Sequence, residues 1–409
     1  MVVFLIDGLP YATLQTQLER KNLPNIQSFF INPNNQLFKA RTAFPALTFP
    51  SITSLLEAAP VDSSGIYGNQ ILYGNSTYQL EDPANFAEFN KMIKDRSVFA
   101  RFDQQGLKTV SASYGFTSDS LSHLQLNDVE AALAIKQKNY KLVDNKIINS
   151  LDKLLVETPE EKWPDFIFVH LIGIDFTSHD LGANSVQVIS YLQYLDSKLA
   201  PIFHHLNQAR GRKVVSMLTS DHGFDRNHEK ALNLEQVLQK VDPQIQVLNE
   251  GRYLSLFFPP GWSLAKRKSV VNDIGLHAAV DIAALRFEDT VYMHSKKLKL
   301  NFSYSEGRCS LSDYKLNIND NSSCPETMDV QIQKSYYPYF VENISHFFKV
   351  SGHPDAVIIA KSGVAFRNDY AAYHGGPTPA ETIVPLLMHN CNIVPQSRIP
   401  SLAELLRFL

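Results

Sequence analysis

The chain has 409 residues and a formal net charge of −3, and 44% of its residues are hydrophobic and 11% aromatic. This composition supplies a buried core and argues against disorder, while the length exceeds that of one usual domain. The nearly balanced charge excludes the basic footprint of a protein that binds nucleic-acid duplexes. Three cysteines exclude a disulfide-dense scaffold and a four-cysteine zinc module.

The N-terminal run is typical of a buried strand. It extends over residues 2–6 and ends at Asp7, and it lacks the basic and apolar regions of a signal peptide. No stretch of the chain has the roughly 18–20 uninterrupted apolar residues of a membrane helix, so we expect no transmembrane segment. We expect a cytoplasmic protein, or a secreted or periplasmic one if a leader was removed from this numbering.

Further elements follow along the chain as alternating strands and helices. Helical spacing of apolar residues predicts helices from near Thr48, over 143–155 and over 185–206. Short apolar runs predict further strands over 166–172, 214–218, 355–360 and 382–387. Continuous apolar strands that alternate with helices predict an α/β fold, with a mostly parallel sheet and helices on both faces.

The stretch 288–342 breaks this alternation. Its short alternating segments are separated by clusters of Gly, Asn, Ser and Asp. We therefore predict a small β and loop insertion at 288–342 within one catalytic core formed by 1–287 and 343–409. Cys309 and Cys324 are close enough in this stretch to form a disulfide, but the sequence does not decide whether they do.

Polar side chains of metal-binding type follow three of the predicted strands. Asp7 follows the first, Asp175 with His179 follows the second, and Asp221 with His222 follows the third. Ligands of open parallel sheets bind outside the carboxyl ends of the strands, so we expect these side chains at one edge. One aspartate after a strand more often caps a helix or turn. Three on one edge, two of them with a histidine, favour a metal site.

Two more positions complete this candidate site. His374 precedes two glycines, which allow close backbone approach, and the following strand returns the chain to the sheet. Thr48 stands before an apolar helical run, so Thr48 or Ser51 is expected to cap that helix. A hydroxyl at a helix N-terminus is also placed for phosphate binding, and a metal bound to it would make it a nucleophile.

The order of these motifs resembles that of the alkaline phosphatase superfamily, and within it the nucleotide pyrophosphatase/phosphodiesterase family. The resemblance extends over residues 5–387 and leaves out only the predicted insertion. The motifs that carry it are Leu5-Ile-Asp7-Gly8, Phe44-Pro45 with Thr48-Phe49-Pro50, Gly65-Ile-Tyr-Gly-Asn69, Asp175-x-x-x-His179 with Gly182, Ser220-Asp-His-Gly223 and His374-Gly-Gly376.

The resemblance implies two zinc ions as cofactors. The first would be held by Asp175, His179 and His374. The second would be held by Asp7, Thr48, Asp221 and His222. Six nitrogen and oxygen ligands with a hydroxyl agree with the composition of a two-metal site.

The resemblance also implies roles around the phosphoryl group. Thr48 would be the nucleophile and Asn69 would hydrogen-bond a phosphoryl oxygen, although an asparagine beside Gly68 is equally natural as a turn residue. Phe49 would stack on a base or leaving group. Tyr140 would form a second wall for the same substrate, with packing against the protein as the alternative.

The implied activity is that of a two-zinc hydrolase for small substrates. It would cleave phosphodiester or pyrophosphate bonds of nucleotide type through a phosphothreonine intermediate. A phosphomonoesterase or mutase of the same superfamily is one alternative. A phosphoethanolamine-type transferase is another, because Gly173-Ile174 stands where members that cleave nucleotides usually carry Glu-Pro. A non-catalytic binding protein is disfavoured by the complete ligand set. The sequence names neither the leaving group nor the oligomeric state.

Overall fold

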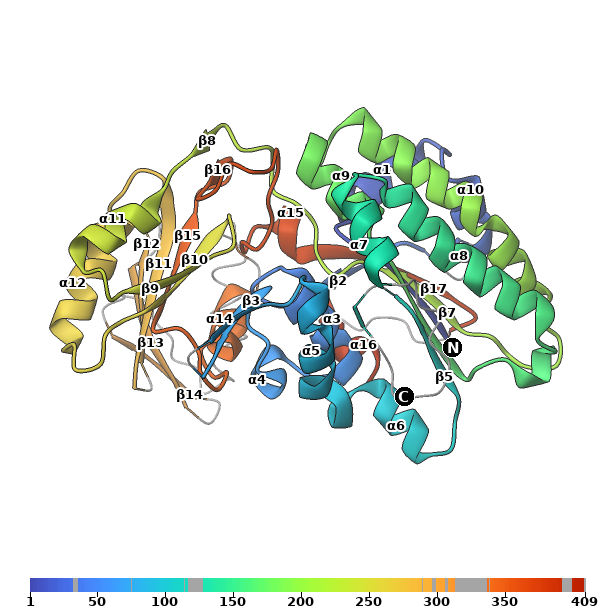
Figure 1. Cartoon of the computed structure of the whole chain (residues 1–409), viewed down its shortest axis with the longest axis horizontal. Coiled ribbons are helices and arrows are strands. Elements are labelled where there is room, and N and C mark those ends of the chain that lie inside the picture. The colour runs from blue at the N-terminus through green and yellow to red at the C-terminus, as the bar shows by residue number, and fades with distance from the viewer. Residues whose placement is uncertain are drawn as a thin grey trace.

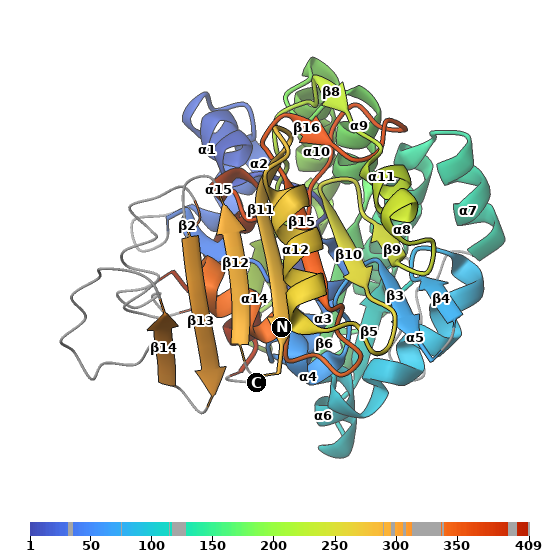
Figure 2. The same ribbon diagram turned by 90° about the vertical axis from the view of Figure 1, so that its left-hand side faces the viewer.

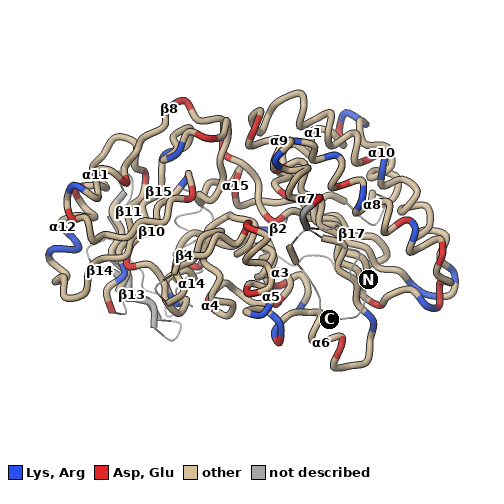
Figure 3. The backbone as a smooth tube through the Cα atoms, viewed as in Figure 1, with Lys and Arg blue, Asp and Glu red and all other residues tan. Residues whose placement is uncertain are grey.

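The computed structural model places two β-sheets side by side, the first to the right of Figure 1 and the second to the left. It describes residues 1–31, 36–74, 76–113, 115–116, 128–288, 290–295, 299–305, 308–312, 337, 339–391 and 399–407. Basic and acidic residues are interspersed over both parts of the molecule (Figure 3).

The first sheet has six strands in the order β2-β17-β7-β1-β6-β5. β1 lies parallel to both β6 and β7, and β5 lies parallel to β6. β17 is antiparallel to its neighbours β2 and β7. The predicted α/β class with a mostly parallel sheet is confirmed. The strands are β1 (Val2–Ile6), β2 (Phe38–Arg41), β5 (Thr109–Ala112), β6 (Phe166–Leu171), β7 (Ser216–Thr219) and β17 (Ile383–His389).

The second sheet is antiparallel throughout, in the order β14-β13-β12-β11-β15-β10-β9 (Figure 2). The predicted strand at 355–360 forms β15 here and not in the parallel sheet, because it pairs with β10 and β11. The strands are β9 (Gln246–Asn249), β10 (Tyr253–Phe257), β11 (Val280–Phe287), β12 (Thr290–Ser295), β13 (Lys299–Ser305), β14 (Arg308–Ser312) and β15 (Ala356–Ala360).

The predicted insertion contributes strands to this second sheet. β12, β13 and β14 come from 288–342 and extend the sheet outward from β11. The boundaries at 288 and 342 remain a prediction. Cys324 lies outside the described residues, as does the pairing predicted for it. The described residues also form two small sheets of two strands each. One pairs β3 (Gln70–Tyr73) with β4 (Ser76–Gln79), and the other pairs β8 (Lys230–Ala231) with β16 (Val364–Ala365).

Helices cover both faces of the first sheet because side chains alternate along each strand. In β1, Val3 and Leu5 belong to one apolar cluster, with residues of α3, α5, α6 and α14. Phe4 and Ile6 belong to the opposite cluster, with residues of α1, α2, α8 and α10. A third cluster packs α11 and α12 on the second sheet. The helices are α1 (Tyr11–Glu19), α2 (Pro24–Phe30), α3 (Thr48–Glu57), α4 (Val61–Ser64), α5 (Phe86–Ile93), α6 (Val98–Gln104), α7 (Asp128–Lys136), α8 (Tyr140–Glu157), α9 (Gly173–Leu181), α10 (Val186–Gln208), α11 (Leu234–Val241), α12 (Leu264–Gly275), α14 (Phe340–Phe347), α15 (Pro379–Thr382) and α16 (Leu402–Leu405).

The start of α3 differs from the predicted cap. The helix begins at Thr48, but its N-cap residue is Leu47 and no side chain caps it. The prediction of Thr48 or Ser51 as the cap is therefore wrong. Pro50 offers no backbone N–H to a capping hydroxyl, and the N–H of Ser51 donates to the carbonyl of Leu47 (3.1 Å). The hydroxyl of Ser51 accepts a hydrogen bond from Thr42 (2.6 Å). The Thr48 hydroxyl is thus available for another partner.

The helix predicted at 143–155 lies within α8, and the one predicted at 185–206 corresponds to α10. Ser185 is the N-cap of α10 and accepts a hydrogen bond from the N–H of Val188 (3.3 Å). Among the described residues, no helix combines the length and the apolar character that crossing a bilayer requires.

Candidate active site

The first ligand group lies between α9 and the loop that leads into β17. Asp175 and His179 are four residues apart on α9, as the spacing predicted, and His374 approaches them from the loop. The Nε2 atoms of His179 and His374 lie 3.1 Å apart. Each is 3.5 Å from one oxygen of the Asp175 carboxylate. These three side chains can therefore share one cation.

The second ligand group lies at the carboxyl ends of β1 and β7. Asp7 follows β1, and Asp221 and His222 follow β7. Nε2 of His222 is 3.4 Å from Oδ1 of Asp7 and 3.3 Å from Oδ2 of Asp221. Oγ1 of Thr48, at the start of α3, lies 3.2 Å from the same nitrogen. A cation in this group would lie beside the Thr48 hydroxyl.

The two groups are adjacent. The rings of His222 and His374, one from each group, stack with their centroids 3.6 Å apart. Gly8 makes room for this approach: a Cβ there would lie 2.9 Å from Oδ1 of Asp175, and the residue has φ +67. The side chains expected at one edge of the sheet are thus together.

Burial and mutual repulsion perturb the pKa values of these acids. Burial, with the Asp221 and Asp175 charges after it, raises the pKa of Asp7 well above its usual range. Burial and the nearby charges of Asp221 and Glu81 likewise raise the pKa of Asp175. Such groups favour their charged form only when a cation compensates them.

The histidine pKa values move in the opposite direction. Burial lowers the pKa of His179 to about 4 and that of His222 below its usual value. It also lowers the pKa of His374 well below the usual value, with the charges of His222 and His179 adding to the effect. Neutral imidazoles are the form that ligates metals.

Hydrogen bonds aim the ligand atoms toward the centre of each group. The Nδ1 atoms of His179, His222 and His374 lie 2.8–3.1 Å from backbone carbonyl oxygens, so these atoms donate and leave the Nε2 lone pairs facing the carboxylates. Three buried carboxylate oxygens have no hydrogen-bond partner among the described residues. They are Oδ1 of Asp7, Oδ1 of Asp175 and Oδ2 of Asp221.

The donor set and its spacing fit zinc. The separations of 3.1–3.5 Å between ligand atoms match the spacing of about 3.3 Å between neighbouring ligands of a tetrahedral ion with bonds of about 2.0–2.1 Å. Two facing lone pairs and three unpaired carboxylate oxygens would be costly to bury without a cation. The residues present therefore fit the two metals that the sequence analysis inferred.

The helix that carries Asp175 and His179 is anchored by an acid that belongs to neither ligand group. Asp144 on α8 accepts hydrogen bonds from the N–H groups of Ile172 (2.9 Å) and Gly173 (3.1 Å), which open α9. A Cβ at Gly173 would lie 2.0 Å from the Tyr191 hydroxyl oxygen. This crowding is the physical reason for a glycine at this position.

Asn69 lies next to the start of α3. Its Oδ1 accepts a hydrogen bond from the N–H of Phe49 (3.2 Å), and its Nδ2 donates to Oε1 of Glu81 (2.6 Å). The amide group is therefore held in one orientation beside Thr48. Its remaining N–H is available to a ligand.

A cavity of about 130 Å³ adjoins the first ligand group. Asn69, Asp175, His179 and His374 all line it. Residues that no sequence motif marked complete its wall; they include Glu81, Phe176, Glu250, Arg367, Tyr370 and Tyr373. Phe176 and Tyr373 stand directly beside the motif residues Asp175 and His374, whereas the other four stand outside every motif, so the sequence offered little signal for this wall.

The two predicted substrate-binding aromatics lie elsewhere. Phe49 is only 4% exposed and packs against Phe89 and Phe116 at centroid distances of 4.9 and 5.1 Å. Tyr140 stacks on Phe176 at 5.0 Å and donates its hydroxyl hydrogen to Asp180. Neither ring lines the 130 Å³ cavity. A substrate-binding role for Phe49 and Tyr140 stays a prediction.

His170 contacts the second ligand group, a role for which the sequence carried no signal. Its Nε2 lies 2.7 Å from Oδ2 of Asp7, whose other oxygen faces His222. This bond orients the Asp7 carboxylate.

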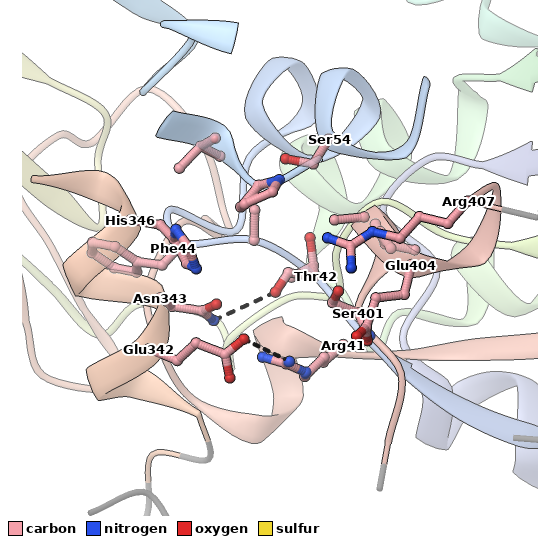
Figure 4. Close-up of a pocket in the computed structure, with 15 residues that line it drawn as sticks. Arg41, Thr42, Phe44, Ser54, Glu342, Asn343, His346, Ser401, Glu404 and Arg407 are labelled. Carbon is pink, nitrogen blue, oxygen red and sulfur yellow. Dashed lines mark hydrogen bonds and ion pairs between the residues drawn. The ribbon is translucent and has the colours of Figure 1, made fainter. Parts of the chain in front are cut away.

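A second cavity, of about 190 Å³, lies between α3, α14 and α16 (Figure 4). Arg41 lies in its wall, paired with Glu342 at 2.8 Å. None of the candidate metal ligands lines this cavity, so it is separate from the two ligand groups.

Comparison with protein families gives one match over most of the chain. The family model described as type I phosphodiesterase / nucleotide pyrophosphatase matches residues 1–377.

Curated relatives match over shorter stretches. Venom phosphodiesterase 2 of Crotalus adamanteus is 23% identical over 226 residues, which are 55% of this chain and 27% of that protein. GPI ethanolamine phosphate transferase 1 of Schizosaccharomyces pombe is 29% identical over 93 residues, 20% of this chain and 10% of that protein. The matched part is thus about a quarter of the venom enzyme and a tenth of the transferase.

Solved structures share the fold over nearly the whole chain. Phosphonoacetate hydrolase of Sinorhizobium meliloti 1021, in complex with phosphonoformate, has a TM-score of 0.64 at 14% identity, covering 98% of this chain and 93% of that one. Murine ectonucleotide pyrophosphatase / phosphodiesterase 5, an inactive threonine-to-alanine variant in complex with AMP, has a TM-score of 0.60 at 14% identity, covering 95% and 87%.

Proposed function

The chain belongs to the type I phosphodiesterase / nucleotide pyrophosphatase family, and on this premise we propose that it is a two-zinc hydrolase that cleaves phosphodiester or pyrophosphate bonds through a phosphothreonine intermediate. The substrates are small molecules of nucleotide type. Family membership supports phosphoester hydrolysis in general. The zinc ions, the intermediate and the substrate class are the proposal.

One observation carries it. Two groups of three ligands meet beside a hydroxyl that caps nothing, and Oγ1 of Thr48 lies 3.2 Å from Nε2 of His222. Buried carboxylate oxygens without hydrogen-bond partners among the described residues support a bound cation in each group. An enzyme that used only water as the nucleophile would need no side-chain hydroxyl beside the metals.

Zinc ions held by these residues would lower the pKa of the nucleophile and neutralise charge on the phosphoryl oxygens. Thr48 attacks phosphorus in line with the bond to the leaving group, which departs as an alcohol or a phosphate. Asn69 donates its remaining amide hydrogen to a phosphoryl oxygen while Glu81 holds the other. Water then attacks the phosphothreonine, which releases the product and restores the Thr48 hydroxyl.

The nucleotide assignment is supported by neighbours of the same fold. AMP is bound in the complex of the murine enzyme, and the venom relatives are phosphodiesterases. Comparing p-nitrophenyl phosphate with p-nitrophenyl thymidine monophosphate separates monoester from diester preference. We expect faster turnover of the diester; preference for the monoester would favour the phosphomonoesterase or mutase alternative.

Replacing the nucleophile tests the covalent route. Thr48→Ala should lower turnover of p-nitrophenyl thymidine monophosphate by at least about 10³-fold while zinc content is largely kept. Thr48→Ser keeps a hydroxyl and should retain measurable turnover. Wild-type rates in the alanine variant would overturn the phosphothreonine route.

A second candidate is a phosphoethanolamine-type transferase. The short match to an ethanolamine phosphate transferase favours it. In this case an added alcohol acceptor would capture the phosphoryl group in place of water. Product analysis with and without an alcohol acceptor distinguishes the two activities. A transferase forms mainly the phosphodiester of the added alcohol, whereas a hydrolase releases mainly the phosphomonoester whether or not the alcohol is present.

A further inference from the structure

The turn between β9 and β10 reaches from the second sheet to the loops that carry the candidate site. It consists of residues 250–252; together with Tyr253, the first residue of β10, it is here called the positioning turn. Three of its four residues make polar contacts with loops of the first half of the molecule or with the His374 loop. These contacts fall into two sets, one around Asn69 and one around the metal ligands.

Glu250 and Tyr253 hold the turn that presents Asn69. Oε1 of Glu250 accepts a hydrogen bond from the N–H group of Gln70 (2.6 Å), the residue directly after Asn69. The hydroxyl of buried Tyr253 donates to the carbonyl of Tyr67 (3.3 Å). The backbone on both sides of Asn69 is therefore fixed from the second sheet.

Gly68 shows how close this contact is. A Cβ at Gly68 would lie 3.0 Å from Oε1 of Glu250 and 3.1 Å from the Tyr253 hydroxyl oxygen. The positioning turn thus packs directly against the backbone next to Asn69. A shift of Glu250 would move the Asn69 amide relative to Thr48.

Arg252 holds two metal-ligand loops at once. Its side chain is 2% exposed, and its Nε donates to Oε1 of Glu381 (3.2 Å). Oε1 of Glu381 in turn accepts a hydrogen bond from the N–H of Gly376 (2.8 Å), which stands two residues after His374. Nη2 of Arg252 lies 3.5 Å from Oδ2 of Asp225, which stands three residues after His222.

The same guanidinium is anchored on its own sheet. Its Nη1 donates to the carbonyl oxygens of Ala360, Lys361 and Val364, at 2.6–3.1 Å. A planar fork with fixed donors can bridge two loops and a sheet edge, which a single ammonium cannot. Arg252 therefore links the second sheet rigidly to the loops of His222 and His374.

We propose that the positioning turn sets the geometry of the active site: Glu250 positions Asn69 on the phosphoryl group, and Arg252 positions the His222 and His374 loops on the metals. The roles of Asn69 and of the histidines rest on the proposed function. Loss of a group that orients a metal ligand costs about 10–100-fold in metal affinity or activity. A misplacement of about 1 Å at the reacting centre costs about 10²-fold in rate.

The Arg252 part is tested by zinc affinity, which needs no turnover. Chelator competition on the purified full chain compares Arg252→Lys with Arg267→Lys. Arg267 lies on α12, which packs on the second sheet, and is paired with Asp355. We expect zinc binding about 10–100-fold weaker in Arg252→Lys and within twofold of wild type in Arg267→Lys. Glu381→Gln removes the charge pair from the opposite side and should weaken zinc binding in the same direction. Wild-type zinc affinity in either folded variant, Arg252→Lys or Glu381→Gln, would overturn this part.

The Glu250 part is tested by steady-state kinetics. Glu250→Leu removes both acceptor oxygens and should lower kcat about 10²-fold with zinc affinity within twofold of wild type. Glu250→Gln keeps one acceptor oxygen and should restore most of kcat. Wild-type kcat in Glu250→Leu, or equal losses in both variants, would overturn this part.

The two failures are distinguishable. If wild-type protein or Thr48→Ala contradicts the proposed function, the comparison of zinc affinities for Arg252 and Arg267 still decides whether the positioning turn acts on the metal ligands. The opposite outcome is that turnover behaves as proposed while Arg252→Lys, Glu381→Gln and both Glu250 variants bind zinc and react as wild type does. The proposed function then stands, and the positioning turn is only structural.

Discussion

The two sheets of the molecule contribute to the site in different ways. In the first, parallel strands end at the same edge, so Asp7, Asp175 and Asp221, which follow β1, β6 and β7, come together. In the second, antiparallel strands send their ends to opposite edges, and its described residues contain no candidate ligand group. Its contribution is the positioning turn. Strand direction thus decides where the candidate metal-binding side chains lie. In our proposal, the positioning turn of the second sheet fixes their geometry.

The largest expected difference is in kcat, between a variant that loses a carboxylate beside the first sheet and one that loses a carboxylate beside the second. Asp221→Asn removes a proposed ligand that follows β7 of the first sheet and should lower kcat about 10³-fold or more, because stabilisation of transition-state charge by a metal is worth several kcal/mol. Asp355→Asn, directly before β15 of the second sheet, loses the pair with Arg267 and should leave kcat within a few-fold of wild type. The measurement is steady-state hydrolysis of p-nitrophenyl thymidine monophosphate. Equal losses in the two variants would contradict the division of roles.

Two buried histidines give a finer comparison within the first sheet. His170→Phe keeps an aromatic ring beside Phe116 but removes the hydrogen bond to Asp7, so zinc affinity should fall about 10–100-fold. His389→Phe, at the far end of β17 against Phe29, should leave zinc affinity unchanged. Chelator competition measures both variants. An unchanged zinc affinity in His170→Phe would show that Asp7 needs no orientation.

The last expected effect is on stability and its dependence on pH, and it does not involve turnover. Burial raises the pKa of Asp144 to about 7, so the folded protein keeps a proton that the unfolded chain loses near pH 4. The stability contributed in this way is present below about pH 4 and falls as pH rises toward 7, at up to about 1.4 kcal/mol per pH unit. Asp144→Asn removes this titrating group and therefore its contribution to the change of the free energy of unfolding with pH.

Urea unfolding of the zinc-free protein at several pH values between 4 and 8 measures it. The stability curve of Asp144→Asn should be flatter than that of wild type over this interval. Parallel curves would mean that Asp144 is ionised in the folded protein throughout. The same residue anchors the start of α9, so zinc affinity of the variant should fall as well.

The predictable part of the site is the part that follows strands. Asp7, Asp175 and Asp221 could be identified because each stands at the end of a buried run, and His179 because one helical turn separates it from Asp175. The structure brings these residues together with His222 and His374 as expected. Their roles as ligands remain the proposal.

The unpredicted part depends on contacts between distant segments. Glu250 and Arg252 belong to no motif, since their function arises only when an antiparallel sheet is docked against the loops after β7 and before β17. The expected cap at Thr48 was wrong because Pro50 has no N–H and the N–H of Ser51 donates to the carbonyl of Leu47, so the helix already includes Thr48. The strand at 355–360 was assigned to the parallel sheet because a fully buried run does not reveal its pairing direction.

The most direct test of the account is the number of zinc ions bound by each chain. Elemental analysis of protein loaded with zinc and passed through a desalting column should give two zinc ions per wild-type chain, and one per chain for Asp175→Asn. A value near zero for wild type, or the same value for both proteins, would contradict the convergence of these side chains on a pair of metals.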